Sequence, residues 1–104
     1  MQILNNHAEN SISVPDATFD EIMRITSGNA FKVYCLVYRN TYGRGTTEVK
    51  LTLNDFCNKC GIASKKTVKK AIRELISLYL LNYVRRGFVT SYHCNVLKRV
   101  NLTE

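Results

Sequence analysis

The stretch from residue 52 to residue 81, TLNDFCNKCGIASKKTVKKAIRELISLYLL, constrains the fold more than any other part of the chain. Its start has the form of a capping box, because Thr52 stands three residues before Asp55. This pattern predicts a first helix over residues 53–60. Gly61 then interrupts the helical period and turns the chain, so a second helix is expected close behind the first.

Ser64 is suited to cap that second helix, because its hydroxyl can accept a hydrogen bond from a backbone N–H of the first turn. From Lys65 onward, apolar residues recur with the spacing of one helix face: Val68, Ala71, Ile72, Leu75, Ile76 and Tyr79. Basic residues stand between them: Lys66, Lys69, Lys70 and Arg73. Two helices joined by a short glycine-containing turn, the second with a basic face, predict a helix-turn-helix.

The net charge of +7 arises entirely in the second part of the chain. Residues 1–60 carry six basic and six acidic side chains, whereas residues 61–104 carry nine basic side chains against Glu74 and Glu104. A neutral part and a basic part indicate a polyanionic partner on one side of the molecule, with nucleic acid the first candidate. A length of 104 residues suits one domain with a single core.

The chain ahead of the helix-turn-helix begins with a polar segment. Residues 1–14 predict an N-terminal arm, and the domain is expected over residues 15–104. Pro15 is suited to the first turn of a short helix that ends near Thr26. Residues 27–29, Ser-Gly-Asn, break that helix.

The next segment, residues 30–41, is the most hydrophobic and predicts the central core helix. Tyr34 and Tyr38 fall on its apolar face, as Tyr79 does on the later helix, so all three are expected in the core. Residues 42–45, Tyr-Gly-Arg-Gly, predict a glycine-rich loop that ends this helix.

Strand patterns flank the helix-turn-helix. Residues 48–51 alternate polar and apolar side chains, which predicts a short strand before it. After it, residues 81–85 predict a strand, Arg86 and Gly87 a tight turn, and residues 88–97 the returning strand. A hairpin directly after a recognition helix is the wing of a winged helix. The predicted fold is therefore α+β and mainly helical, a winged helix-turn-helix of order α-α-β-α-α-β-β with a small antiparallel sheet.

The predicted contact surface combines the second helix of the motif with the hairpin turn. The first helical turn would approach base edges, and the ammonium groups would pair with phosphates. Lysine suits phosphates better than bidentate base reading, so we expect more anchoring than base discrimination. The residues expected to contact double-stranded DNA are Ser64, Lys65, Lys66, Thr67, Lys69, Lys70, Arg73, Arg85 and Arg86.

An ordinary solvated surface is the alternative interpretation of these charges. A salt-bridged surface helix carries acidic residues four positions from its basic ones, whereas Glu74 stands alone here, which favours a partner. Arg85 and Arg86, at the predicted wing tip, can enter a narrow minor groove or bind the flanking phosphates. They can equally be turn residues without a partner.

The cysteines invite a zinc hypothesis, because Cys57 and Cys60 have ligand spacing and His93 and Cys94 follow later. A structural zinc site has two paired clusters, whereas adjacent strand residues such as His93 and Cys94 point to opposite faces. Cys57 and Cys60 fall on the core side of the first motif helix, where cysteine serves as a small apolar residue. We therefore expect thiols in the core and no metal.

Signals for catalysis and for membrane insertion are lacking in the sequence. There is no phosphate-cradling glycine loop, and His7 and His93 lack neighbouring carboxylates, so we expect neither enzymatic activity nor a cofactor. The longest apolar run, residues 33–38, is too short for a membrane span, and the N-terminus does not have the form of a signal peptide. These patterns predict a cytoplasmic protein without a membrane partner.

Residues 14–87 resemble the N-terminal winged-helix domain of phage O-type replication proteins and, more loosely, of plasmid replication initiators. The matching segments are PDATFDEIMRI, NAFKVYCLVYRNTYGRG and KLTLNDFCNKCGIASKKTVKKAIRELISLYLL. In that family, a helix ending in Arg-x-Thr-Tyr-Gly precedes a strand and a helix-turn-helix whose second helix opens Ser-x-x-Thr-Val. Residues 39–43 and 64–68 match these two patterns.

The resemblance implies a DNA-binding protein of a mobile element, such as a phage or plasmid, that recognises a replication origin as all or part of a replication initiator. It also implies other replication proteins as partners, and a homodimer or neighbouring copies on repeated sites. Other interpretations stay open: a transcriptional regulator that binds an operator, a winged-helix protein-interaction module, or RNA binding, for which the usual aromatic motifs are missing.

Overall fold

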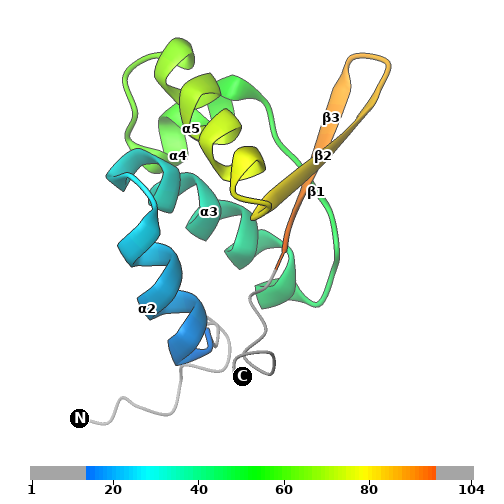
Figure 1. Ribbon diagram of the computed structural model, residues 1–104. Helices are drawn as coiled ribbons and strands as arrows, with labels where there is room; N and C mark the ends of the chain where they lie inside the picture. Colours follow the sequence, from blue (N-terminus) through cyan, green and yellow to red (C-terminus); the bar gives the residue numbers. More distant parts are fainter. Residues whose placement is uncertain (1–13, 96–104) are drawn as a thin grey trace, which may run out of the picture.

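The computed structural model describes residues 14–95. The N-terminal arm expected over residues 1–14 and the predicted end of the last strand therefore lie almost wholly outside the described residues. The elements in chain order are α2 (Asp16–Ile25), α3 (Gly28–Asn40), the 3₁₀ helix η2 (Tyr42–Arg44), β1 (Val49–Lys50), α4 (Leu53–Cys60), α5 (Lys65–Ser77), β2 (Leu81–Arg86) and β3 (Val89–Cys94) (Figure 1). This order confirms the predicted succession of helices and strands in an α+β, mainly helical chain.

The three strands form one antiparallel sheet in the order β1-β3-β2. β2 and β3 pair from Leu81 with Cys94 to Arg86 with Val89. A two-residue loop, residues 87–88, therefore closes the hairpin. β1 pairs only with the middle of β3. Helices followed by this sheet and its hairpin make a winged-helix-like topology, as the sequence predicts.

Helix α3 is the centre of the molecule, as predicted, because α2, α4, α5 and β3 all pack against it (Figure 1). Ala30, Val33 and Val37 of α3 are completely buried. Tyr34 is buried too, and its hydroxyl donates a hydrogen bond of 3.0 Å to the carbonyl of Asn95, which ties the helix to the end of β3. None of the described helices is long and apolar enough to cross a membrane.

The helix-turn-helix has the local structure that its sequence predicts. The Thr52 N–H donates to the Asp55 carboxylate at 2.9 Å, and the Asp55 N–H donates to the Thr52 hydroxyl at 3.0 Å, which completes the capping box. Gly61 ends α4 in the left-handed conformation, at φ 69°. The Ser64 hydroxyl accepts a hydrogen bond from the Thr67 N–H at 3.1 Å and caps α5.

Two boundaries around α3 differ from the prediction. The expected break at residues 27–29 is shorter, because Ser27 caps α3 by accepting a hydrogen bond from the Ala30 N–H, so the helix begins at Gly28. The expected glycine-rich loop is a 3₁₀ turn, Tyr42–Arg44, followed by Gly45 at φ 74°. The Ser27 cap in the first place, and short-range backbone hydrogen bonds in the second, extend regular structure into residues whose types favour turns.

The prediction that Tyr79 packs in the core is wrong, because α5 ends at Ser77 and Tyr79 is 83% exposed. Tyr79 has φ 60°. Its N–H donates to the Ile76 carbonyl at 3.0 Å, and the N–H of buried Leu80 donates to the Leu75 carbonyl at 2.9 Å. These two hydrogen bonds form a Schellman motif, in which Tyr79 occupies the left-handed position that glycine usually fills.

Replacing Tyr79 by glycine is therefore expected to stabilise the protein. A left-handed residue with a Cβ costs roughly 1 kcal/mol, and the exposed ring loses little packing when it is removed. We expect Tyr79→Gly to raise the free energy of unfolding in urea by about 0.5–1 kcal/mol. Leu78→Gly, at a neighbouring position with φ −93°, is the matched control and should destabilise. A destabilised Tyr79→Gly would show that the ring contributes packing.

Glu74 is the one acidic residue of α5, and its carboxylate is directed to the start of α3. It accepts hydrogen bonds from the Ser27 N–H at 2.8 Å and the Ser27 hydroxyl at 2.7 Å. In the described part of the chain it forms no ion pair with Lys70, its neighbour one turn earlier. The only acid of α5 therefore joins α5 to α3 instead of neutralising the basic face.

Loss of this link should destabilise the fold modestly. We expect Glu74→Ala to lower the free energy of unfolding by about 1 kcal/mol, since hydrogen bonds to a partly exposed carboxylate are lost. Arg73→Ala changes the adjacent residue of the same helix and should stay within about 0.5 kcal/mol of the wild type. Equal urea midpoints for the two variants would contradict the role given to Glu74.

Candidate nucleic-acid interface

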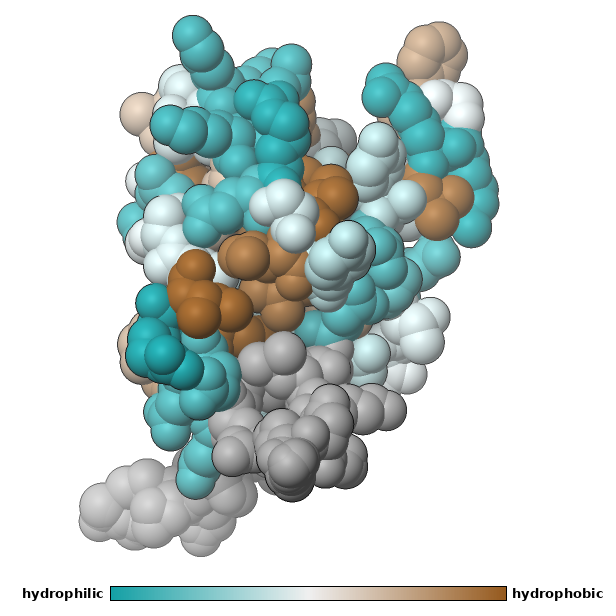
Figure 2. Space-filling view, viewed as in Figure 1, coloured by the Kyte–Doolittle hydropathy of each residue, from teal (hydrophilic) through white to brown (hydrophobic). Residues whose placement is uncertain are grey.

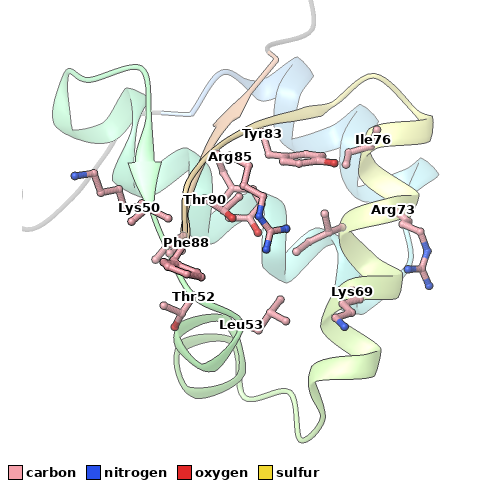
Figure 3. Close-up of a pocket in the computed structure, with 14 residues that line it drawn as sticks. Lys50, Thr52, Leu53, Lys69, Arg73, Ile76, Tyr83, Arg85, Phe88 and Thr90 are labelled. Carbon is pink, nitrogen blue, oxygen red and sulfur yellow. The ribbon is translucent and has the colours of Figure 1, made fainter.

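A groove of about 860 Å³ lies between α5 and the β2–β3 hairpin. It is visible as the hollow between the two upper lobes of the molecule in Figure 2, and its lining is drawn in Figure 3. The helix-turn-helix forms one side and the hairpin forms the other. The lining residues are Lys50, Leu51, Thr52, Leu53, Lys69, Ile72, Arg73, Ile76, Tyr83, Arg85, Phe88, Val89, Thr90 and Tyr92.

Apolar side chains make up the base of this groove. Ile72 and Ile76 come from α5, and Tyr83 and Tyr92 come from the hairpin, with ring centroids 6.4 Å apart. Tyr92 packs edge-on against Phe56 of α4, at 5.2 Å between centroids, which fixes the base of the hairpin to the helix-turn-helix. Burial raises the pKa of Tyr92, although the nearby Arg85 guanidinium opposes the shift. The tyrosine is therefore a neutral hydroxyl.

Four cationic side chains line the groove, and three of them come from its two facing sides, α5 and β2. Lys69 and Arg73 project from α5, and the guanidinium of Arg85 extends from β2 into the space between hairpin and helix (Figure 3). All three are exposed, and none of the described lining residues is acidic. Like charges brought together without a counterion raise the local potential and attract an anion.

The remaining predicted residues of α5 lie along its solvent-facing surface. Lys65, Lys66 and Lys70 are exposed, outside the groove lining. Thr67 is half-buried, and its hydroxyl lies 3.0 Å from that of Ser64. Residues two positions apart on a helix do not share a face, so Thr67 and Lys69 point in different directions. The first turn of α5 thus presents lysines more openly than hydroxyls.

The structure separates the two arginines that the sequence placed together at the wing tip. The tip is formed by Gly87 and Phe88, and both arginines belong to β2, so their assignment to the tip is wrong. Glycine at φ 65° takes the first loop position, which suits a type II′ hairpin turn. Successive strand residues point to opposite faces, so Arg85 faces the groove while Arg86 pairs with Glu48 at 3.3 Å.

Sequence reasoning missed several groove residues, namely Lys50, Tyr83 and Phe88. Tyr83 shares a strand face with Arg85, so the period of two in β2 could have placed the two together. Lys50 lines the groove, but its amine is directed away from α5 (Figure 3). The sequence did not indicate that Phe88 lies at the groove, because its exposure depends on which residues close the hairpin.

The cysteines do not assemble into a metal centre in the described part of the chain, where no group of three or more His, Cys, Asp or Glu side chains could hold an ion. All four are free thiols. Burial raises the pKa of Cys35, Cys60 and Cys94, so these thiols are protonated at neutral pH. Cys94 is fully buried and donates to the Tyr34 carbonyl. Cys94 belongs to the hydrophobic core, and Cys57 and Cys60 are partly buried against it.

The sequence was compared with protein-family models and with curated proteins, and neither comparison gave a match.

Proposed function

We propose that this protein binds double-stranded DNA, with α5 in the major groove and the β2–β3 hairpin along the adjacent backbone. We further propose that it acts at a replication origin, as all or part of the replication initiator of a mobile element. The observation that carries DNA binding is that Lys69, Arg73 and Arg85 line one groove, which has no acidic residue in its described lining. A further row of exposed lysines, Lys65, Lys66 and Lys70, extends this surface along α5.

The positions of the acidic residues support the same proposal. Within the described residues, ion pairs join Arg24 to Glu21 and Arg86 to Glu48, and Glu74 is bonded to Ser27. The cations of α5 and Arg85 are therefore left for an external anion. Ordinary surface helices place opposite charges one turn apart, which α5 does not do.

The chemistry of the surface favours backbone contacts over base reading. Lysine ammonium groups bind phosphate as mobile point charges, whereas an arginine guanidinium can donate two parallel hydrogen bonds. Affinity would then depend steeply on salt, since each phosphate contact releases counterions. Arg73 and Arg85 are the residues best suited to bidentate contacts.

The role in replication is supported by the resemblance of residues 14–87 to phage O-type replication proteins. An operator-binding regulator would use the same contacts, so the identity of the bound DNA decides between the two roles.

Fluorescence anisotropy with duplex fragments tiled across the DNA around the gene, at several salt concentrations, tests both DNA binding and the identity of the bound site. One fragment bound far more tightly than the others, with a steep salt slope, is the expected result. Its activity as an origin in a plasmid-maintenance assay would support the replication role, and absence of duplex binding at physiological salt would overturn the proposal.

Replacing Lys69 tests whether the groove contacts DNA phosphates. Lys69→Ala should weaken binding to all duplexes alike and reduce the slope of log K against log salt by about one unit, because one phosphate contact is lost. Lys32→Ala is the matched control, since Lys32 is an exposed lysine of α3 outside the groove lining. An unchanged slope for Lys69→Ala would remove this residue from the interface.

Arg85 and Arg86 are adjacent in sequence, but replacing each of them should affect duplex binding differently. Arg85→Ala should weaken duplex binding by about tenfold or more, since an arginine contact is worth roughly 1–3 kcal/mol. Arg86→Ala should weaken it by less than about threefold, because Arg86 faces away from the groove and pairs with Glu48. Equal losses in anisotropy titrations would show that both hairpin faces meet DNA.

A further inference from the structure

The outer half of the β2–β3 hairpin projects beyond the rest of the sheet. β1 pairs with Ser91 and Tyr92, and the N–H of Leu51, directly after β1, donates to the Thr90 carbonyl at 3.4 Å, so residues 86–89 form a two-stranded ribbon without a third strand. Figure 1 shows this end of the hairpin extending away from the helices. Its tip consists of Gly87 and Phe88.

The side chain of Phe88 is completely exposed, at 102% of its reference area. The other phenylalanines whose surroundings are described all have partners. Phe56 is buried, and Phe19 packs against Phe31 with centroids 5.6 Å apart. The Phe88 ring therefore adds little to the stability of the fold, and it stands at the tip of the hairpin.

The surroundings of Phe88 indicate the chemistry of its partner. Arg85 and Arg86 directly precede the tip, and Glu48, the acid next to the hairpin, is already paired with Arg86. On the groove side, the Arg85 guanidinium extends toward α5, which contributes Lys69 and Arg73 to the groove lining (Figure 3). An apolar ring that directly follows two arginines and lines a groove with other cations suits a polyanion that also offers an apolar interior, and a stack of base pairs is such a partner.

We propose that Phe88 inserts as a wedge between adjacent base pairs of bound DNA, from the minor groove beside the major groove that holds α5. This inference rests on the proposed binding of duplex DNA. Apolar side chains inserted in this way unstack one base step and kink the duplex by about 20–90°. Pyrimidine–purine steps unstack most readily, so the wedge would select such a step without any hydrogen bond to a base. This adds the base-step discrimination that the lysines of α5 do not supply.

The test uses the full chain and a duplex selected from a random pool by the wild-type protein. A 2-aminopurine base is moved through the selected site to report unstacking, and circularly permuted fragments report the bend. The wild-type protein is expected to increase the fluorescence at one step and to bend the DNA there. Phe88→Ala should abolish the fluorescence increase, at least halve the bend and weaken binding by about three- to tenfold, with an unchanged salt slope.

Two further variants make the result specific. Phe88→Leu keeps an apolar wedge and should retain most of the bend. Tyr79→Ala removes another strongly exposed aromatic ring, just before the opposite end of β2, and should bind and bend DNA as the wild type does. Because the Phe88 ring is exposed, Phe88→Ala should retain the wild-type melting temperature.

The outcomes separate the wedge from DNA binding itself. Wild-type protein that binds the selected duplex without unstacking any step, or Phe88→Ala that bends DNA as the wild type does, would overturn the wedge and leave duplex binding intact. Failure to select any duplex would overturn the proposed function and the wedge with it.

Discussion

The packing of α5 against α3 is the constraint on which the rest of the structure depends. Val68, Ala71 and Leu75 turn one face of α5 completely inward. Burying a large apolar side chain contributes roughly 1.5–3 kcal/mol, whereas a surface ion pair contributes about 0–1 kcal/mol. The apolar face therefore decides how α5 is rotated about its axis. The basic residues point to solvent because the positions between them are needed by the core.

The turn after α5 determines how the hairpin is placed relative to this helix. Tyr79 adopts a strained left-handed conformation, and the chain then turns so that Leu80 and Leu81 are buried. β2 thus begins in the core and leaves it along the side of α5. The edge-on contact between Phe56 and Tyr92 holds the sheet against the helix-turn-helix. Together these contacts set the width of the groove between helix and hairpin.

The two sides of the groove differ in chemistry, and this difference suggests a division of work. The α5 side presents mostly lysines, which attract phosphates with little dependence on base sequence. The hairpin side presents Arg85, aromatic rings and the exposed tip, which respond to groove shape and base stacking. General affinity would come from the helix, and much of the discrimination would come from the wing.

The helix-turn-helix was determined by sequence alone, because its signals act over a few residues: a capping box at Thr52, a left-handed glycine at Gly61 and an N-cap at Ser64. Only the tertiary structure decided the positions of Tyr79, Arg86 and Phe88. The end of α5 follows from the burial of Leu80, and the hairpin loop follows from a register in which Arg86 pairs with Val89. Both depend on contacts between residues far apart in the chain. The groove is formed by such contacts. The charged residues that line it come from separate elements, and no local sequence pattern in one element predicts its position relative to the other.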